Sequence, residues 1–146
     1  MSRCLKKSYG CGKAATEVGI LLDTHAFLWW LSGNTKLSAL ARTTIAEGTS
    51  SGIFVSAASV WEIATKHRLG KLPIAQELAA DLEAAIVAQG FLGLAVTVRH
   101  GQHAGALPGP HADPFDRMLI AQAILDDLTL ISNETPFDAY AVKRLW

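Results

Sequence analysis

Four carboxylic acids, in separate stretches of the sequence, stand where an element is expected to begin or end: Asp23, Glu62, Asp116 and Glu134. Carboxylates that converge repel one another unless a cation lies between them. All-oxygen ligation suits Mg²⁺ or Mn²⁺, which keep several waters and coordinate phosphate oxygens of a substrate. If these acids meet, the chemistry they indicate is metal-dependent hydrolysis of a phosphodiester bond.

Each acid also has a purely structural interpretation. Asp23 could cap a turn or a helix, and Asp113, which precedes a proline, could be only the N-cap of the next helix. Asp116 could simply favour a helix dipole. Glu62 could pair with Lys66 one turn later. The combination of separated acids, rather than any one of them, therefore indicates a site.

The composition is that of one globular domain. The chain has 146 residues, of which 50% are hydrophobic and 18% charged, and its 13 basic and 13 acidic residues cancel. Neutrality supplies no long-range attraction for a polyanion, so nucleic acid would have to be met by local patches. Two cysteines are too few for a disulfide framework, which favours a reducing cytoplasm. No apolar run is long enough to span a membrane.

The first part of the chain differs from the rest. Residues 1–18 are basic, then rich in Gly, Ser and Ala, and they follow neither a helical nor a strand period. We expect residues 1–18 to be a flexible leader and residues 19–146 to form the domain.

Short apolar runs alternate with helical patterns along the domain. Strands are expected at 19–23, 52–56, 91–98, 129–133 and 142–146, and helices at 38–48, 56–70, 73–90, 115–127 and 136–141. The Gly, Pro and His-rich stretch 100–114 is expected to be a loop. This alternation predicts an α/β fold with a parallel sheet covered by helices on both faces. Ligands bind beyond the carboxyl ends of such strands, which is where the acids are expected.

Four stretches of the sequence resemble, in order, the PIN domain, and specifically the VapC-type toxins of bacterial VapBC toxin–antitoxin pairs. They are ILLDTHAFLWWL, VSAASVWEIATKHRLGKL, HADPFDRMLIAQA and LTLISNETPFDAYAVKRLW, and they span about Gly19 to Trp146. The resemblance implies a three-layer α/β/α sandwich with a short central parallel sheet. It also implies a Mg²⁺ or Mn²⁺ cofactor and endoribonuclease activity on cellular RNA.

The resemblance assigns the acids to roles. Asp23, Glu62 and Asp116 match the first three acids of the family, and Asp113 lies near enough to assist as a metal ligand. The fourth acid of the family is usually aspartate, whereas this chain has Glu134. Its side chain is longer by one methylene, so the second metal position is the part of the site that this departure affects.

Further residues are candidates for substrate contact. Lys66 could orient the acid one turn before it or meet an RNA phosphate, and Arg117 is a second candidate for a phosphate contact. Ser132 could hydrogen-bond a ligand or a water. Thr24 could orient the first acid or contact substrate.

A packed helix is expected to hold Glu62, with Trp61 and Ile63 fixing its direction from the core. The nearby run AFLWWL, with Trp29 and Trp30 adjacent, is too large an apolar patch to leave in water, so it should be partly core and partly a groove for a partner. The resemblance implies that this partner is a cognate VapB-type antitoxin, and it also suggests a toxin homodimer.

Two other interpretations remain at this point. His100, His103, His111 and Asp113 could form a transition-metal site, although their spacing fits no familiar zinc pattern. The chain could instead be a non-hydrolytic module that binds RNA or antitoxin through a weakened metal site, an alternative that rests on Glu134.

Overall fold

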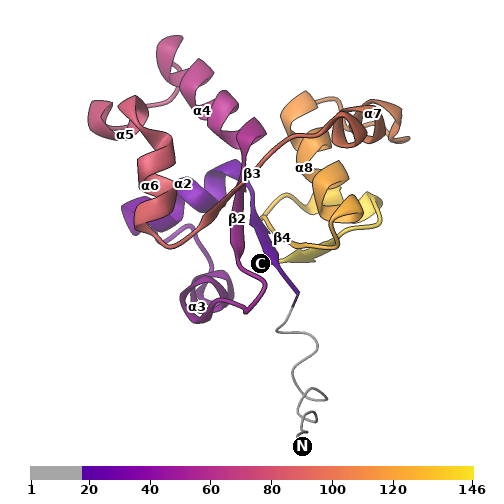
Figure 1. Ribbon diagram of the computed structural model, residues 1–146, viewed down its shortest axis with the longest axis horizontal. Coiled ribbons are helices and arrows are strands. Elements are labelled where there is room, and N and C mark those ends of the chain that lie inside the picture. The colour runs from indigo at the N-terminus through magenta and orange to yellow at the C-terminus, as the bar shows by residue number, and fades with distance from the viewer. Residues whose placement is uncertain (1–17) are drawn as a thin grey trace, which may run out of the picture.

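The computed structural model describes residues 18–146, and a five-stranded parallel sheet forms its centre (Figure 1). The strand order is β3-β2-β1-β4-β5, and every neighbouring pair is parallel. The strands are β1 (Ile20–Leu22), β2 (Ile53–Ser56), β3 (Leu92–Leu94), β4 (Thr129–Ile131) and β5 (Lys143–Leu145). All five predicted strands are present, but the strand predicted over 91–98 covers only Leu92–Leu94, because Thr97 caps helix α7 (Val98–Ala106) and Val98 begins it. The predicted leader lies outside the described residues, apart from Val18.

Strand β1 lies in the middle of the sheet, and its neighbours end level with it. Leu22 pairs with Val55 of β2 on one side and with Ile131 of β4 on the other. All three residues of β1 are buried, as expected for a strand covered on both faces. The residues that follow β1, β2 and β4 therefore emerge together at one edge of the sheet.

Helices cover both faces of the sheet, so the predicted three-layer α/β/α sandwich is confirmed (Figure 1). One apolar core joins the sheet to residues of α2 (Thr24–Ser32), α3 (Ala39–Glu47), α4 (Ala57–Arg68), α5 (Gln76–Ala80) and α6 (Leu82–Ala88). The other joins it to residues of α8 (Pro114–Leu125) and of the 3₁₀ helix η1 (Thr135–Ala139). Helix α7 (Val98–Ala106) packs on α8.

Local capping signals set several helix boundaries. Ser38 caps α3 by accepting a hydrogen bond from Ala41 N, and Ser56 caps α4 by accepting one from Ala58 N. Gly48 and Gly70 follow these two helices with positive φ angles of 69° and 73°. Glycine adopts this conformation without steric cost, which ends each helix where the sequence predicts.

The single helix predicted over 73–90 is wrong, because the chain forms two helices there. Asp81 breaks the segment with φ −151° and ψ 80°, and its side chain accepts a hydrogen bond from Ala84 N at the start of α6. An aspartate offers the backbone this alternative to continuing a helix. Pro73 lies before both helices rather than in a first turn.

The loop predicted over 100–114 is also wrong in its first half, which belongs to α7. Thr97 accepts a hydrogen bond from His100 N, and His100 Nδ1 accepts one from Thr97 N, so the two residues form a capping box. His100 and Ala104 are buried. Packing on α8 stabilises this helix in spite of its two glycines, whose intrinsic helix propensity is low.

The apolar run after Asp23 is helical and forms α2. Phe27 and Leu28 are buried in the core, whereas both tryptophans of this run are half-buried. Within residues 18–146, no helix is long and apolar enough to cross a membrane.

Candidate active site

Asp23 lies directly after β1 and is both a helix cap and a buried acid. Its Oδ1 accepts a hydrogen bond of 2.7 Å from Ala26 N in the first turn of α2, and the Ser132 hydroxyl also donates to its carboxylate. Burial raises the pKa of Asp23 to about 6, against the lowering effect of these hydrogen bonds, and the charge of Asp116 raises it further. Asp23 is therefore a helix cap and, at the same time, a buried acid with a raised pKa.

Asp113 and Asp116 come from the start of α8. Asp113 Oδ1 accepts hydrogen bonds from Phe115 N and Asp116 N, at 2.9 and 3.2 Å, which makes it the N-cap of this helix. Burial raises the pKa of Asp116, and the charges of Asp113 and Glu62 add to this rise. A hydrogen bond from His111 opposes it. The Asp116 carboxylate thus lies among acids from three different elements.

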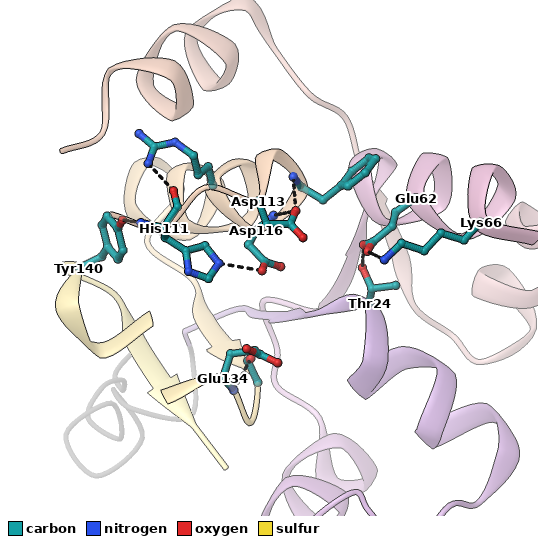
Figure 2. A network of polar contacts seen from close by, with 11 residues as sticks. Thr24, Glu62, Lys66, His111, Asp113, Asp116, Glu134 and Tyr140 are labelled. Atoms are coloured by element: carbon teal, nitrogen blue, oxygen red, sulfur yellow. Dashed lines mark hydrogen bonds and ion pairs between the residues drawn. The ribbon is translucent and has the colours of Figure 1, made fainter. Parts of the chain in front are cut away.

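Glu62 extends from α4 with both carboxylate oxygens already bonded (Figure 2). Oε1 lies 2.6 Å from the Thr24 hydroxyl, which is also hydrogen-bonded to Ser59, and Oε2 lies 2.5 Å from Lys66 Nζ. The side chain is only 6% exposed. Two polar partners therefore satisfy this buried acid, and they fix its direction.

Lys66 brings a positive charge to the acids. Its hydrogen bond with Glu62 is the largest cause of a raised pKa, and the charges of Glu62, Asp113 and Asp116 raise that pKa further. The ammonium group thus lies in the field of three carboxylates. It partly offsets their mutual repulsion in the protein without metal.

Glu134 and Ser132 follow β4, and Figure 2 shows Glu134 beyond the end of this strand, on the side of Asp116 away from α8. Ser132 is fully buried, and its hydroxyl accepts a hydrogen bond of 3.0 Å from Glu134 N. The Glu134 side chain is half-buried, and its carboxylate has no hydrogen bond or ion pair within residues 18–146. Ser132 thus joins the turn after β4 to Asp23.

The expected support of Glu62 by Trp61 is wrong. Trp61 is 67% exposed and packs edge-on against Phe115, with ring centroids 5.2 Å apart. Neighbouring residues on a helix point about 100° apart, so a buried Glu62 turns Trp61 outward. Ile63 is fully buried, as predicted. Thr24 orients Glu62 rather than the first acid.

Arg117 was predicted as a phosphate contact, and in the structure its guanidinium group donates to three backbone carbonyls. Its Nε donates to Ala104 O at 3.1 Å, Nη1 donates to His111 O at 2.8 Å, and Nη2 donates to Leu107 O. The guanidinium group is therefore committed to backbone carbonyls between α7 and α8. Its place next to Asp116 in the sequence suggested a position in the acidic site. Adjacent residues of a helix point about 100° apart, however, so Arg117 extends in a different direction from Asp116.

His111 was considered only for the alternative histidine site and not for the acidic site, yet its Nε2 lies 2.8 Å from Asp116 Oδ2. The sequence signal for this contact was the short spacing between the two residues, since His111 lies five positions before Asp116. His100 instead caps α7 and contacts Asp126 at 3.0 Å. Across residues 18–146, no three His, Cys, Asp or Glu side chains form a group that could hold a metal, so the histidine site is not found.

The same finding limits how the acids could bind a cation. They meet at one edge of the sheet, but the described residues hold no ready-made set of three ligands. Asp23 and Asp116 offer oxygen donors with raised pKa values, and a cation would relieve the cost of charging them. Such donors fit Mg²⁺ or Mn²⁺, which complete their coordination with waters and substrate oxygens, better than they fit zinc.

Comparison with known proteins identifies this arrangement of elements. The model of the PIN domain family matches residues 20–143. No curated protein matches the chain in sequence.

Several solved structures share the fold at low sequence identity. VapBC2 from Rickettsia felis, bound to a DNA fragment from its promoter, matches with a TM-score of 0.64 and 14% identity over 87% of this chain and 97% of that one. FitAcB from Neisseria gonorrhoeae matches with a TM-score of 0.63 and 18% identity over 87% and 96%. VapC20 from Mycobacterium tuberculosis, a sarcin-ricin loop cleaving toxin, matches with a TM-score of 0.59 and 18% identity over 84% and 95%.

Proposed function

The chain belongs to the PIN domain family, and on this basis we propose that it is a metal-dependent endoribonuclease and the toxin of a type II toxin–antitoxin pair. The observation that carries the proposal is the approach of Asp23 and Asp116. They come from the end of β1 and the start of α8, yet the charge of Asp116 raises the pKa of Asp23. A buried and a half-buried acid brought together in this way, with raised pKa values, are a common mark of a functional site.

Asp23 and Asp116 would hold Mg²⁺ or Mn²⁺, with Asp113 and Glu134 as further candidate ligands. When bound, the ion would activate water and neutralise charge on the phosphodiester. Ser132 holds the Asp23 carboxylate in place through its hydroxyl. Asp23 and Asp116 are held by hydrogen bonds before substrate arrives, which reduces the reorganisation that the reaction requires.

The opposite side of the site is formed by Glu62 with its two partners. Lys66 is the candidate contact for an RNA phosphate, because its ammonium group already faces the acids and its side chain is 39% exposed. Thr24 is 7% exposed and engaged with Glu62, so we assign it to orienting that acid rather than to contacting substrate. RNA as the substrate is supported by the family and by the activity named for VapC20.

A groove along α2 is the candidate binding surface for a VapB-type antitoxin. Its walls include Leu28, Trp29 and Leu31 on one side and Ile74 and Leu78 on the other, around a volume of about 430 Å³. Because these lining residues are apolar, the groove favours an apolar segment of a partner chain. Structural relatives from toxin–antitoxin complexes support this assignment. A homodimer and a cytoplasmic location are part of the same proposal.

The test is cleavage of single-stranded RNA by purified protein, freed of any antitoxin, with Mg²⁺, with Mn²⁺ and with EDTA. We expect cleavage with either metal, and a loss of at least about a hundredfold in Asp23→Asn, because one electrostatic contact in a site is worth this much. Asparagine also caps helices, so the variant should fold. Asp127→Asn is the matched control, since Asp127 is an exposed partner of Lys143 and has φ 53°, which asparagine tolerates. Undiminished cleavage by Asp23→Asn would overturn the proposal.

One observation favours the second candidate, a module that binds RNA or antitoxin without hydrolysis. Residues 18–146 hold no ready-made group of three metal ligands. This candidate predicts that the protein binds RNA in the same experiment but does not cleave it with Mg²⁺, with Mn²⁺ or with EDTA.

A further inference from the structure

The segment between α7 and α8 holds a histidine against one acid of the site. His111 Nε2 lies 2.8 Å from Asp116 Oδ2, with both side chains partly exposed at 18% and 25%. In Figure 2 the imidazole ring points directly at the Asp116 carboxylate. A nitrogen that carries a proton donates this hydrogen bond, and the carboxylate accepts it.

Hydrogen bonds fix the backbone of His111 at both its N–H and its carbonyl. Its N–H donates to the Tyr140 hydroxyl at 3.2 Å, and its carbonyl accepts from Arg117 Nη1 at 2.8 Å. Gly109 makes the first contact possible, because a Cβ atom at this position would lie 2.7 Å from the Tyr140 hydroxyl oxygen. Two other segments, one with Tyr140 and one with Arg117, therefore determine where this residue lies.

The ring itself is also held. It packs edge-on against Phe137, with centroids 5.5 Å apart and planes at 83°, and Phe137 is fully buried in the second core. A ring packed in this way against a core residue cannot swing away from Asp116 without losing that contact. The hydrogen bond is therefore imposed on the acid by the fold.

The two carboxylate oxygens of Asp116 differ in their hydrogen bonding. Oδ2 is bonded to His111, and within residues 18–146 no hydrogen bond to Oδ1 is formed. A donor that fixes one oxygen of a carboxylate also fixes the direction of the other. Because Asp23 lies close enough for its pKa to respond to the charge of Asp116, the free oxygen belongs to the same acidic site.

We propose that His111 is a positioning residue, which holds Asp116 so that a single carboxylate oxygen is presented to a divalent cation. The inference rests on the proposed function for the presence of that cation. It gives His111, which the sequence analysis considered only as a ligand of a histidine metal site, a role beside Asp116. Partners of this kind typically change metal affinity about tenfold or more when they are removed.

The test measures Mn²⁺ binding by electron paramagnetic resonance, independently of RNA cleavage. In His111→Phe, a ring still packs against Phe137 but the donor is lost, and we expect about a tenfold rise in the Kd for Mn²⁺. In His111→Gln, the amide N–H₂ group replaces the Nε2 donor, and we expect a Kd close to that of the wild type. His103→Gln, in α7 and away from the acids, is the matched control for replacing a histidine.

A double variant separates positioning from support of the loop. If His111 acts through Asp116, His111→Phe should add little to the loss of Mn²⁺ binding already caused by Asp116→Asn. Urea unfolding of the metal-free variants shows whether the loop is disturbed, and His111→Asn, too short to reach Asp116, replaces His111→Phe if that variant does not fold.

Two results would overturn the inference. One is a wild-type Kd in His111→Phe, and the other is an equally weakened Kd in His111→Gln. A wild-type protein that binds Mn²⁺ but does not cleave RNA would refute the proposed nuclease while the comparison of Kd values still decides the role of His111. A wild-type protein that binds no Mn²⁺ would overturn both.

Discussion

Lys66 Nζ lies 2.5 Å from Glu62 Oε2, one helical turn away, and this pair gives a buried glutamate a positively charged partner. The two side chains differ in exposure, at 39% for Lys66 and 6% for Glu62. Loss of the lysine would leave a buried carboxylate with only the Thr24 hydroxyl as a partner. The ion pair therefore has consequences for stability that an exposed pair would not have.

We expect Lys66→Met to lower the free energy of unfolding by about 1–3 kcal/mol, which is the usual cost of leaving a buried charged group without its partner. Lys143→Met is the matched control, because the Lys143–Asp127 pair is exposed on both sides, and it should change stability by less than about 0.5 kcal/mol. Urea unfolding at neutral pH measures both. Adding Glu62→Gln to Lys66→Met should recover part of the loss, and equal effects of the two lysine variants would contradict this account.

The raised pKa of Asp23 predicts how stability changes with pH. Its ordinary value is 3.8 and its value in the fold is about 6, so between these values the folded protein binds more protons than the unfolded chain. The contribution of Asp23 to stability is therefore greatest below about pH 4 and falls as the pH rises to about 6. Above that pH the charged side chain costs about 2–3 kcal/mol.

Asp23→Asn removes this charge and keeps the cap, so the variant should be more stable than the wild type at pH 7 but not at pH 4. Urea unfolding in EDTA, at pH 4, 5, 6 and 7, measures the difference between the two proteins. That difference should grow toward about 2–3 kcal/mol as Asp23 becomes charged in the wild type. A difference that stays constant with pH would mean that Asp23 does not titrate in this range.

Metal binding should oppose the same protonation. We expect Mn²⁺ at a hundredfold excess over its Kd to stabilise the protein by about 2.7 kcal/mol at pH 7.5, and much less at pH 5, where Asp23 is largely protonated. Thermal unfolding with and without Mn²⁺ measures this as a shift in Tm. Asp116→Asn should lose the shift, whereas Asp127→Asn should keep it. A Tm shift that is the same at both pH values would mean that Mn²⁺ does not bind to the Asp23 carboxylate.

Glu134 stands where the sequence resemblance leads us to expect an aspartate, and substitutions of this residue test its role in the site. Its carboxylate makes no hydrogen bond or ion pair in the described part of the chain, so shortening it breaks no visible contact. We therefore expect Glu134→Asp to keep or raise the rate of RNA cleavage at saturating Mn²⁺. Glu134→Ala should lower that rate at least about tenfold if the carboxylate is used. A large loss in Glu134→Asp would show a site built around the longer side chain.

Features that depend on near neighbours in the sequence were predictable. Ser38 and Ser56 cap helices through their own backbone surroundings, and the buried strand before Asp23 ends at the acid as its apolar pattern predicts. The edge of the sheet then follows from the parallel order of the strands. This is why the edge of the sheet at which the acids lie could be predicted.

Features that depend on distant partners were not predictable. Arg117 was expected at a phosphate because it is basic and stands next to an acid, but three backbone carbonyls surround its guanidinium group in the fold. Helix α7 forms because His100 completes a cap and because Ala104 is buried, in spite of glycines that argue for a loop. Trp61 looked like a core residue by type, whereas helix geometry turns it toward solvent.

Helix α2 connects the acidic site with the groove proposed to bind an antitoxin. It begins at Asp23, which caps its first turn, and its later turns carry Trp29 beside the groove. One residue inserted between them would rotate the tryptophan by about 100° around the helix axis. The length of this segment is therefore under a double constraint: substitutions along it can accumulate, but insertions and deletions would disconnect the acid from the groove.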